Sequence, residues 1–401
     1  MTDPRDSDPT PDSNPEVDPE RARQPFRSFV RYFVGLGTWG FGGPIASVGY
    51  MQRDLVERRN WLDKDEFLDG VALGQTMPGP LAAQVAMWVG FLQKGALGAL
   101  GIAAAFILPS FVFVLVVAVI YVHYEGLAFL QSLFYGIAPA VMAIIAIAAF
   151  KLARLTDGRD KRLWVITLVI GTVTAITGTE VAYLIIAAGV FMVAWDAPPR
   201  WLPGRGSRSR GIFFPTPVIS STLVHLSVAG GTLVALFLFF LKSGAFIFGS
   251  GLAIVPFLRE GVVVQHHWLT DRQFLDAVAM GLITPGPVVI TATFIGYLVG
   301  GLAGAVIATV GIFTPIYLGV VLPGRWFVTH RDNLQIKAFV KGATAAAAGA
   351  IAGATIILTR DSVTDYRTAA VALISFGVLW KFKIKEPYVV AFGAVAGLLL
   401  H

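Results

Sequence analysis

The chain has 401 residues, of which 55% are hydrophobic and only 14% are charged, and its mean hydropathy is +0.70. This composition excludes an ordinary soluble domain and indicates a polytopic, all-α membrane protein. The net charge of +6 is typical of cytoplasmic loops and does not indicate nucleic-acid binding. Because the chain has no cysteine, disulfides, thiolate metal sites and thiol catalysis are excluded, and we expect no metal and no cofactor.

The first 24 residues differ from the rest, since they are acidic, rich in proline and almost free of apolar side chains. We expect a disordered tail, and the missing apolar stretch argues against a cleavable secretory signal. The apolar runs that follow predict about 12 to 13 spans, near residues 28–50, 67–92, 96–122, 127–153, 163–179, 181–197, 220–241, 243–258, 274–298, 301–322, 338–358, 367–380 and 387–400.

The two halves of the chain repeat one another at a constant offset of 207 residues. The matching letters are WL at 61 and 268, FLD at 67 and 274, and PGP at 78 and 285. So many identities in one register indicate a duplicated unit. The expected organisation is a first transport repeat at 25–198, a basic cytoplasmic linker at 199–219, a linking span at 220–241 and a second transport repeat at 242–401.

The basic loops predict the orientation of the chain in the cytoplasmic (inner) membrane. Positive charge concentrates at 154–162, 200–210, 325–337 and 381–385, which places the N-terminus in the cytoplasm and the C-terminus outside. An odd number of spans then separates Trp61 from Trp268, so the repeats are expected to have inverted topology. One loop fits poorly, because Arg53, Arg58 and Arg59 fall outside in this count.

Two apolar runs contain a Pro-Gly-Pro sequence at their centre. Pro78 and Pro80 lack an N–H and would free two carbonyls, and Pro285 and Pro287 would do the same in the second half. Unpaired backbone at membrane depth must be covered by protein or face a cavity. A half-helix is expected to begin after each Pro-Gly-Pro, with N–H groups that attract an anion. Alanine at 78 and 80 is expected to mend the first helix.

Glycine-rich segments predict a break in each neighbouring span, and in an inverted pair the four breaks can meet near the midplane. Single kinks and close helix packing are the alternative explanation for each motif alone. The duplication favours a binding site, whose candidate substrate-binding residues are Gly42, Gly43, Pro44, Gln75, Thr76, Pro78, Gly79, Pro80, Lys242, Gly249, Ser250, Gly251, Thr284, Pro285, Gly286 and Pro287.

Two aspartates, Asp69 and Asp276, occupy corresponding positions early in their apolar runs. Proton coupling is one interpretation, and stabilisation of a helix start is the other. Lys242 lies between two apolar runs, where it either contacts substrate or extends to an interface. Thr and Gln side chains in such helices can donate to an oxyanion, but they commonly bond to backbone or to a neighbouring helix.

The motif FGGP at 41–44, followed by QTMPGP at 75–80 and repeated as FGSG at 248–251 and PGP at 285–287, resembles the chromate ion transporter family in its long, two-domain form. The resemblance implies export of chromate from the cytoplasm, driven by the proton motive force and giving chromate resistance. The second half departs at Ser250-Gly251 and Leu282-Ile283, so the first is expected to carry more polar contacts. The residues by themselves indicate only an anion transporter with inverted repeats.

Several functions compete with this one. One alternative is transport of sulfate or another oxyanion, including uptake, because such an anion would suit the same architecture and has nearly the same charge and shape. An anion channel is a further alternative. An intramembrane enzyme needs a nucleophile and a base, and the chain shows no such motif; it also lacks a P-loop, so we expect neither an enzyme nor a primary pump. The expected partners are chromate or sulfate, protons and the lipid bilayer, and the sequence does not indicate an oligomeric state.

Overall fold

The computed structural model describes residues 24–40, 43–124, 128–177, 182–198, 231–247, 251–330, 333–382, 384 and 386–400. Every regular element in this part of the chain is a helix, which confirms the predicted all-α fold. The predicted tail, apart from Gln24, and the predicted linker at 199–219 lie outside the described residues.

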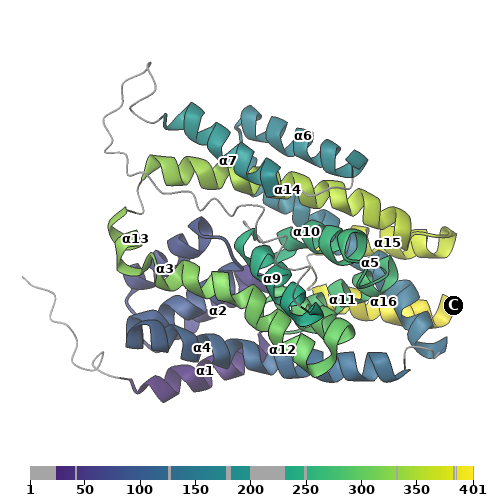
Figure 1. Cartoon of the computed structure of the whole chain (residues 1–401), viewed down its shortest axis with the longest axis horizontal. Coiled ribbons are helices and arrows are strands. Elements are labelled where there is room, and N and C mark those ends of the chain that lie inside the picture. Colours follow the sequence, from purple (N-terminus) through teal and green to yellow (C-terminus); the bar gives the residue numbers. More distant parts are fainter. Residues whose placement is uncertain are drawn as a thin grey trace, which may run out of the picture.

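The helices occur in the same order in the two halves (Figure 1). Those of the first half are α1 (Phe26–Trp39), α2 (Gly43–Met51), the π-helix η2 (Gln52–Arg58), α3 (Lys64–Thr76), α4 (Leu81–Tyr124), α5 (Ala128–Asp157), α6 (Lys161–Thr177) and α7 (Ala182–Asp196). Those of the second half are α9 (Thr232–Ala245), η3 (Gly251–Ile254), α10 (Val255–Arg259), η4 (Glu260–Gln265), α11 (Asp271–Ile283), η5 (Val288–Ile290), α12 (Thr291–Val321), α13 (Gly324–His330), α14 (Leu334–Ser362), α15 (Tyr366–Phe382) and α16 (Glu386–Leu400).

Helix α1 and the pair α2–η2 form a hairpin that returns to the side of the molecule where α1 begins, which we call the N-side. Phe29, near the start of α1, packs against Trp61, with ring centroids 5.0 Å apart. The Arg59 guanidinium lies over the ring of Tyr32 at 5.4 Å. The two ends of the segment 26–61 therefore lie together, and its middle is the tip of the hairpin.

Helix α3 and the start of α4 form a second hairpin. The indole N–H of Trp88 donates to the carbonyl of Glu66, at 2.9 Å. A Cβ at Gly70 would lie 2.2 Å from the Trp88 ring, and one at Gly74 would lie 2.8 Å from Leu81. Only glycine allows this approach, so the two helical arms of the hairpin pack closely along its length.

Helix α4 then reverses again, at Lys94 and Gly95. These residues have φ values of −143° and +59°, and the reversal brings Gly90 against the backbone of Gly98. We call residues 81–93 the short arm and residues 96–124 the long arm of α4. The short arm completes the second hairpin, and the long arm runs from the N-side to the opposite side, which we call the C-side.

The second half repeats this path in detail. Gly300 and Gly301 have φ values of −144° and +59°, which match Lys94 and Gly95 and divide α12 into a short and a long arm. Asn60 and His267, at corresponding positions, are the non-glycine residues with positive φ in the described part, at 49° and 51°. The duplication read from the sequence is therefore a duplication of backbone conformation.

The two repeats have inverted topology. The hydroxyl of Tyr317, late in the long arm of α12, donates to the carbonyl of Ala96, at the start of the long arm of α4, at 3.0 Å. The long arms therefore run antiparallel, which confirms the predicted inversion.

Helix α9 packs on α12 as α1 packs on α4. A Cβ at Gly37 would lie 2.3 Å from the carbonyl oxygen of Phe106, and one at Gly244 would lie 2.2 Å from that of Ile312. We therefore propose that the second repeat begins by Thr232 rather than at residue 242. Residues 220–230 of the expected linking span lie outside the described part.

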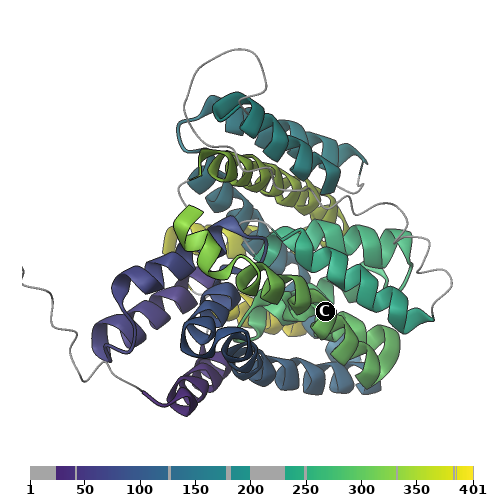
Figure 2. The same cartoon turned by 60° about the vertical axis from the view of Figure 1, so that its left-hand side comes forward.

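The remaining helices surround these hairpins. Helices α6 and α7 lie against α14 as one layer, seen at the top of Figures 1 and 2, while α5, α15 and α16 pack together below it. Among the described residues, four helical stretches are long and apolar enough to cross a membrane: Leu81–Tyr124, Ser132–Asp157, Val288–Val321 and Leu334–Arg360. In the first and third stretches, only the long arm forms a crossing.

The two ends of the described chain lie on opposite sides. A Cβ at Gly397 would lie 2.2 Å from the carbonyl of Ser132, so α16 ends beside the start of α5 on the C-side. Helix α1 begins on the N-side, where the Lys94 ammonium lies 5.0 Å from the ring of Phe26.

The predicted spans at 28–50, 67–92 and 274–298 are wrong, because each run enters the protein and folds back. The predicted span at 243–258 is likewise one arm of a hairpin and not a crossing. The expectation that alanine at 78 and 80 would mend a helix is wrong for the same reason: the chain reverses at that point. Because the run at 28–50 folds back, the loop with Arg53, Arg58 and Arg59 lies on the N-side, so the poor fit of these charges disappears.

Candidate anion site

The first Pro-Gly-Pro forms the tip of the α3–α4 hairpin, residues 77–80, which we call the first tip. Helix α3 ends at Thr76, and the Met77 N–H donates to Leu73 at 2.8 Å. The buried Gln84 Nε2 donates to the carbonyls of Met77 and Pro78, at 3.2 and 3.0 Å. One side chain therefore satisfies the two carbonyls exposed by the reversal, as buried backbone requires.

The second Pro-Gly-Pro forms the equivalent second tip, residues 284–287. Helix α11 ends at Ile283, and the Thr284 N–H donates to Met280 at 3.1 Å. The Pro285 carbonyl accepts a 2.5 Å bond from the hydroxyl of Ser110, which belongs to the long arm of α4 and also lies 3.3 Å from the Gly37 carbonyl. The second tip is thus bonded by a side chain of the first repeat.

The tips of the hairpins converge at the centre of the molecule. The Gly79 N–H donates to the carbonyl of Ile247, at the end of the first hairpin of the second repeat, at 2.6 Å. A Cβ at Gly251 would lie 3.5 Å from the Cβ of Val288 and 3.9 Å from that of Pro80. Segments at three of the four predicted breaks are therefore brought together, and Ser110 links the second tip to Gly37, which precedes the remaining break in the first hairpin.

Two half-helices begin at this centre. The first backbone bonds into α4 are donated by Ala83 and Gln84 to Pro80, and the first into η5 is donated by Ile290 to Pro287. The N–H groups that precede these bonds, starting with Leu81 and Val288, lie ahead of the helical ladder and carry the partial positive charge of a helix start. Gly79 is not such a donor, because Ile247 already uses its N–H.

The polar side chains predicted for the site have other partners. The hydroxyls of Thr76 and Thr284 donate to the carbonyls four residues earlier, Ala72 and Met280, at 2.7 and 2.5 Å. Gln75 is exposed. Gly43 and Pro44 begin α2, whereas Gly42, Gly249 and Ser250 lie outside the described residues.

Lys242 lies in the last turn of α9, in the first hairpin of the second repeat. Its ammonium is 5.2 Å from the ring of Phe257. Burial and the nearby Lys242 ammonium lower the pKa of His266, in the loop that follows this hairpin.

Asp69 and Asp276 are both buried but have different surroundings. The Asp276 carboxylate accepts a 2.8 Å bond from the hydroxyl of Tyr121, which crosses from the first repeat to the second. The position that corresponds to Tyr121 is occupied by the buried Phe327, which has no hydroxyl. The duplicated carboxylates are therefore not equivalent.

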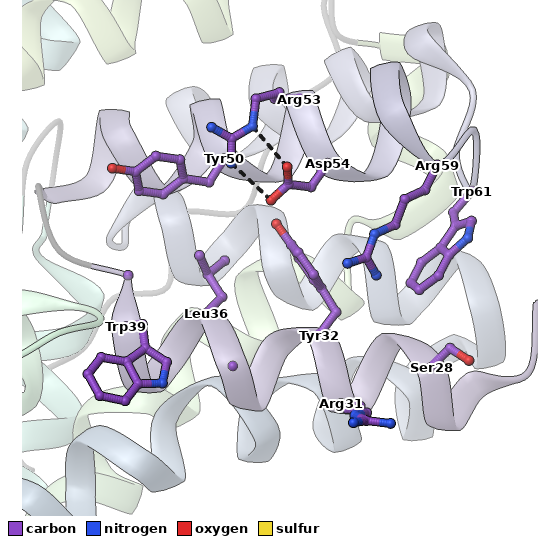
Figure 3. Close-up of a pocket in the computed structure, with 12 residues that line it drawn as sticks. Ser28, Arg31, Tyr32, Leu36, Trp39, Tyr50, Arg53, Asp54, Arg59 and Trp61 are labelled. Carbon is purple, nitrogen blue, oxygen red and sulfur yellow. Dashed lines mark hydrogen bonds and ion pairs between the residues drawn. The ribbon is translucent and has the colours of Figure 1, made fainter.

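A cavity of about 740 Å³ opens between the two arms of the first hairpin (Figure 3). Its charged lining residues are Arg31, Arg53, Asp54 and Arg59. Asp54 and Arg59 point toward Tyr32, which rises from the opposite arm. The sequence analysis treated Arg53 and Arg59 only as topological charges and missed this cavity. A comparison of the two repeats at each position would have drawn attention to these residues, because none of the three arginines recurs 207 residues later.

Known proteins share this organisation. A family model described as chromate transporter matches residues 27–193 and again 234–398. A chromate transport protein of Cupriavidus metallidurans is 49% identical over 94% of this chain and 93% of its own length. A probable chromate transport protein of Synechococcus elongatus is 44% identical over 93% and 95%.

A shorter relative matches only part of the chain. An uncharacterized transporter of Bacillus subtilis is 28% identical over 41% of this chain but 92% of its own length, as a single repeat would be. No solved structure matches the chain. The relatives are named as transporters and not as enzymes, and both repeats fall within the family model. The chain therefore belongs to the chromate transporter family.

Proposed function

We propose that the protein is a secondary transporter that exports chromate from the cytoplasm, driven by the proton motive force, and so confers chromate resistance. The observation that carries the proposal is that both Pro-Gly-Pro tips and the glycine segment of the second repeat meet between two inverted repeats. Transporters built in this way place the substrate where their interrupted helices meet. The names of the relatives support chromate as the cargo.

The proposed substrate site is the space around the two tips and the glycine segments beside them. Chromate is a tetrahedral dianion with acceptor oxygens and no donors, so it suits N–H groups at helix starts. The N–H groups after Pro80 and Pro287 are the proposed donors. Gln75 stays in the proposed site, whereas the Thr76 and Thr284 hydroxyls, which bond to the backbone, are better suited to shaping it.

The charge distribution supports the export direction. The N-side carries the loops around Arg58, Arg159 and Lys337, which is typical of the cytoplasmic face. The cavity between the arms of the first hairpin also opens near this side. We therefore propose that the N-side is cytoplasmic, that the C-terminus is outside, and that the protein resides in the inner membrane.

Proton coupling is proposed for Asp69 and Asp276. A buried carboxylate inside a membrane protein is costly unless it is paired or protonated, and such residues often mark proton pathways. In this proposal a proton from outside binds one of these carboxylates after chromate has been released. The protonated carrier then returns to its inward-facing state, and the proton leaves to the cytoplasm.

Flux in proteoliposomes tests this function. Chromate and sulfate transport would be measured with and without an imposed pH gradient. Chromate flux that rises with the gradient and is inhibited by sulfate is the expected result. Equal flux without any gradient dependence would indicate a channel, and sulfate flux without chromate flux would indicate a sulfate transporter.

Orientation has its own test. Reporter domains would be fused before residue 24 and after residue 401. A reporter that is active only in the cytoplasm should work at the N-terminus and fail at the C-terminus. Activity at both ends would contradict the proposed topology.

A further inference from the structure

The first hairpins of the two repeats share one backbone path but have opposite character. At the positions of Arg31, Arg53 and Arg59, the second repeat has Leu238, Glu260 and His266. A hairpin with three cations thus faces the N-side, while its inverted copy, near the C-side, has lost all three. The second hairpin instead carries Lys242 and Arg259, and Arg259 is paired with Asp271. The cluster of three arginines is therefore a property of one entrance only.

The space between the arms differs in the same way. In the second hairpin, Phe239 stacks on Phe257 at 5.9 Å and contacts Trp268 at 5.8 Å. Gly261 permits this, because a Cβ there would lie 2.0 Å from the Phe239 ring. The first hairpin has Asp54 at the position of Gly261, and there the arms enclose the cavity of about 740 Å³.

The arginines of the first hairpin are only partly neutralised. Arg53 forms a two-pronged ion pair with Asp54, with N–O distances of 2.9 and 3.3 Å. Among the described residues, no carboxylate lies within ion-pair distance of Arg31 or Arg59. Three cations against one anion leave two positive charges in excess, which matches the charge of a tetrahedral dianion.

Arg59 is held in place by rings rather than by acids. Its guanidinium lies 4.7 Å from the Trp61 ring and 5.4 Å from the Tyr32 ring. Such cation–π contacts fix the position of a guanidinium while leaving its N–H groups able to bond. A guanidinium fork suits two oxygens of an oxyanion, and a cavity wall focuses its field.

From these observations we infer that the cavity lined by Arg31, Arg53 and Arg59 is an entry site that captures the tetrahedral oxyanion at the N-side, before it reaches the converging tips. The cavity extends along α1 from Ser28 to Gly40, so it leads from the N-side to the tip of the first hairpin. This inference rests on the proposed anion transport and adds a second anion site to it. Because the three arginine positions are Leu238, Glu260 and His266 in the second repeat, this capture site has no equivalent on the C-side.

The test uses the double variant Arg31→Gln/Arg59→Gln in inside-out membrane vesicles, which expose the proposed cytoplasmic side. The KM for chromate should rise about tenfold while kcat stays within about twofold, because capture is lost and the tips are intact. Higher ionic strength should raise the wild-type KM more than that of the variant. Unchanged KM in the double variant, with normal wild-type flux, overturns the inference but leaves the transport function standing.

Two matched variants separate capture from structure. Arg58→Gln removes the same charge one residue from Arg59; its side chain is 70% exposed and does not line the cavity, and its ion pair with Asp54 is long, at 4.0 Å, so KM should change far less than in the double variant. Arg59→Lys keeps the charge and loses the fork, so it should recover only part of the wild-type KM. An equal rise in KM for Arg58→Gln would show a general surface-charge effect and overturn the inference.

Lipid phosphate has the same chemistry as the proposed anion, and the vesicle composition distinguishes the two. The KM rise should persist in vesicles of phosphatidylcholine alone. If it appears only when phosphatidylglycerol is present, the cavity takes lipid headgroups and the inference is overturned.

Equilibrium dialysis of purified protein with chromate and with sulfate makes the inference independent of flux. Weaker binding by the double variant supports it even if wild-type chromate flux is absent, and equal binding overturns it. Absent wild-type flux by itself would reject only the proposed transport.

Discussion

The two hairpin tips have the same backbone path but different polar partners. The carbonyls of Met77 and Pro78 in the first tip accept from Gln84 of their own repeat, whereas the Pro285 carbonyl of the second tip accepts from Ser110 of the other repeat. The first tip also has a bond between repeats, from the Gly79 N–H to Ile247. At the position of Gln84 the second repeat has Thr291, whose hydroxyl donates only to Val288 at 2.9 Å. At the position of Ser110 it has Ile316, which packs on Gly79. The two repeats therefore share the chain reversal at the Pro-Gly-Pro sequence but differ in the side chains that bond to it.

This difference matters for a carrier whose repeats move against each other. A bond within one repeat travels with it, while a bond between repeats must lengthen or break if the repeats rock. The bonds from Gln84 to the first tip are therefore expected to persist, while the bonds from Ser110 to Pro285 and from Gly79 to Ile247 are expected to be remodelled during transport. The bond between Tyr121 and Asp276 also crosses the interface, so both carboxylate and tip of the second repeat are tied to the first.

The largest expected effect concerns the two carboxylates. Asp276→Asn should reduce pH-gradient-driven chromate flux to the level of protein-free liposomes, because it removes the carboxylate that is proposed to carry the proton and is bonded to Tyr121 of the other repeat. Asp69→Asn should leave a measurable gradient response. Flux would be recorded at matched amounts of folded protein. Identical behaviour of the two variants would show that Tyr121 does not distinguish the carboxylates.

Gly286→Ala should be the most destabilising change at the tips. Gly286 has φ +101°, and a Cβ there would lie 2.3 Å from the Ser110 hydroxyl. Strain and overlap together should lower the free energy of unfolding by about 3 kcal/mol. The added change Ser110→Gly should recover the steric part. Thermal unfolding in detergent measures both, and a double variant no more stable than the single one would contradict this packing.

Gln84→Leu should cost about 2 kcal/mol, because two buried carbonyls lose their donor. The loss of stability is limited because the buried Gln84 Oε1 has no hydrogen-bond partner. Replacing this unpaired oxygen with an apolar group removes a desolvation penalty and so offsets part of the cost. The matched change Thr291→Val removes only the bond to Val288 and should cost about 1 kcal/mol. If the two substitutions prove equally costly by thermal unfolding, the tips are not stabilised unequally.

Ser110→Ala should have the smallest effect on stability, about 1 kcal/mol, since a single hydroxyl is removed. Its effect on transport should exceed its effect on stability, because the lost bond joins the repeats. The readouts are chromate turnover and thermal unfolding of the same preparation. A normal turnover would show that the bond to Pro285 has no part in the cycle.

Much of the fold follows from residue patterns. The apolar runs, the constant offset and the Pro-Gly-Pro pair predict an all-helical duplicated protein with interrupted helices, and the structure confirms each. The inverted topology is also expected from the charged loops, although several of the counted spans are hairpins. The site is less predictable: Thr76 and Thr284 look like donors in the sequence, yet both are bonded to their own helices.

What the sequence determined by itself is where helices form and stop, because proline and glycine act on the chain locally. What only the tertiary structure decided is the direction of the chain after each stop. Hydropathy indicates only whether a segment is removed from water. A membrane span and a buried hairpin of two half-helices are both removed from water, so hydropathy does not distinguish them. The reversal depends on contacts such as Gly70 with Trp88, whose partner lies 18 positions away in the chain. The reversal between α1 and α2 in the first hairpin places Arg31 on the arm opposite Arg53 and Arg59, and so makes one cavity from charges that lie far apart in the sequence.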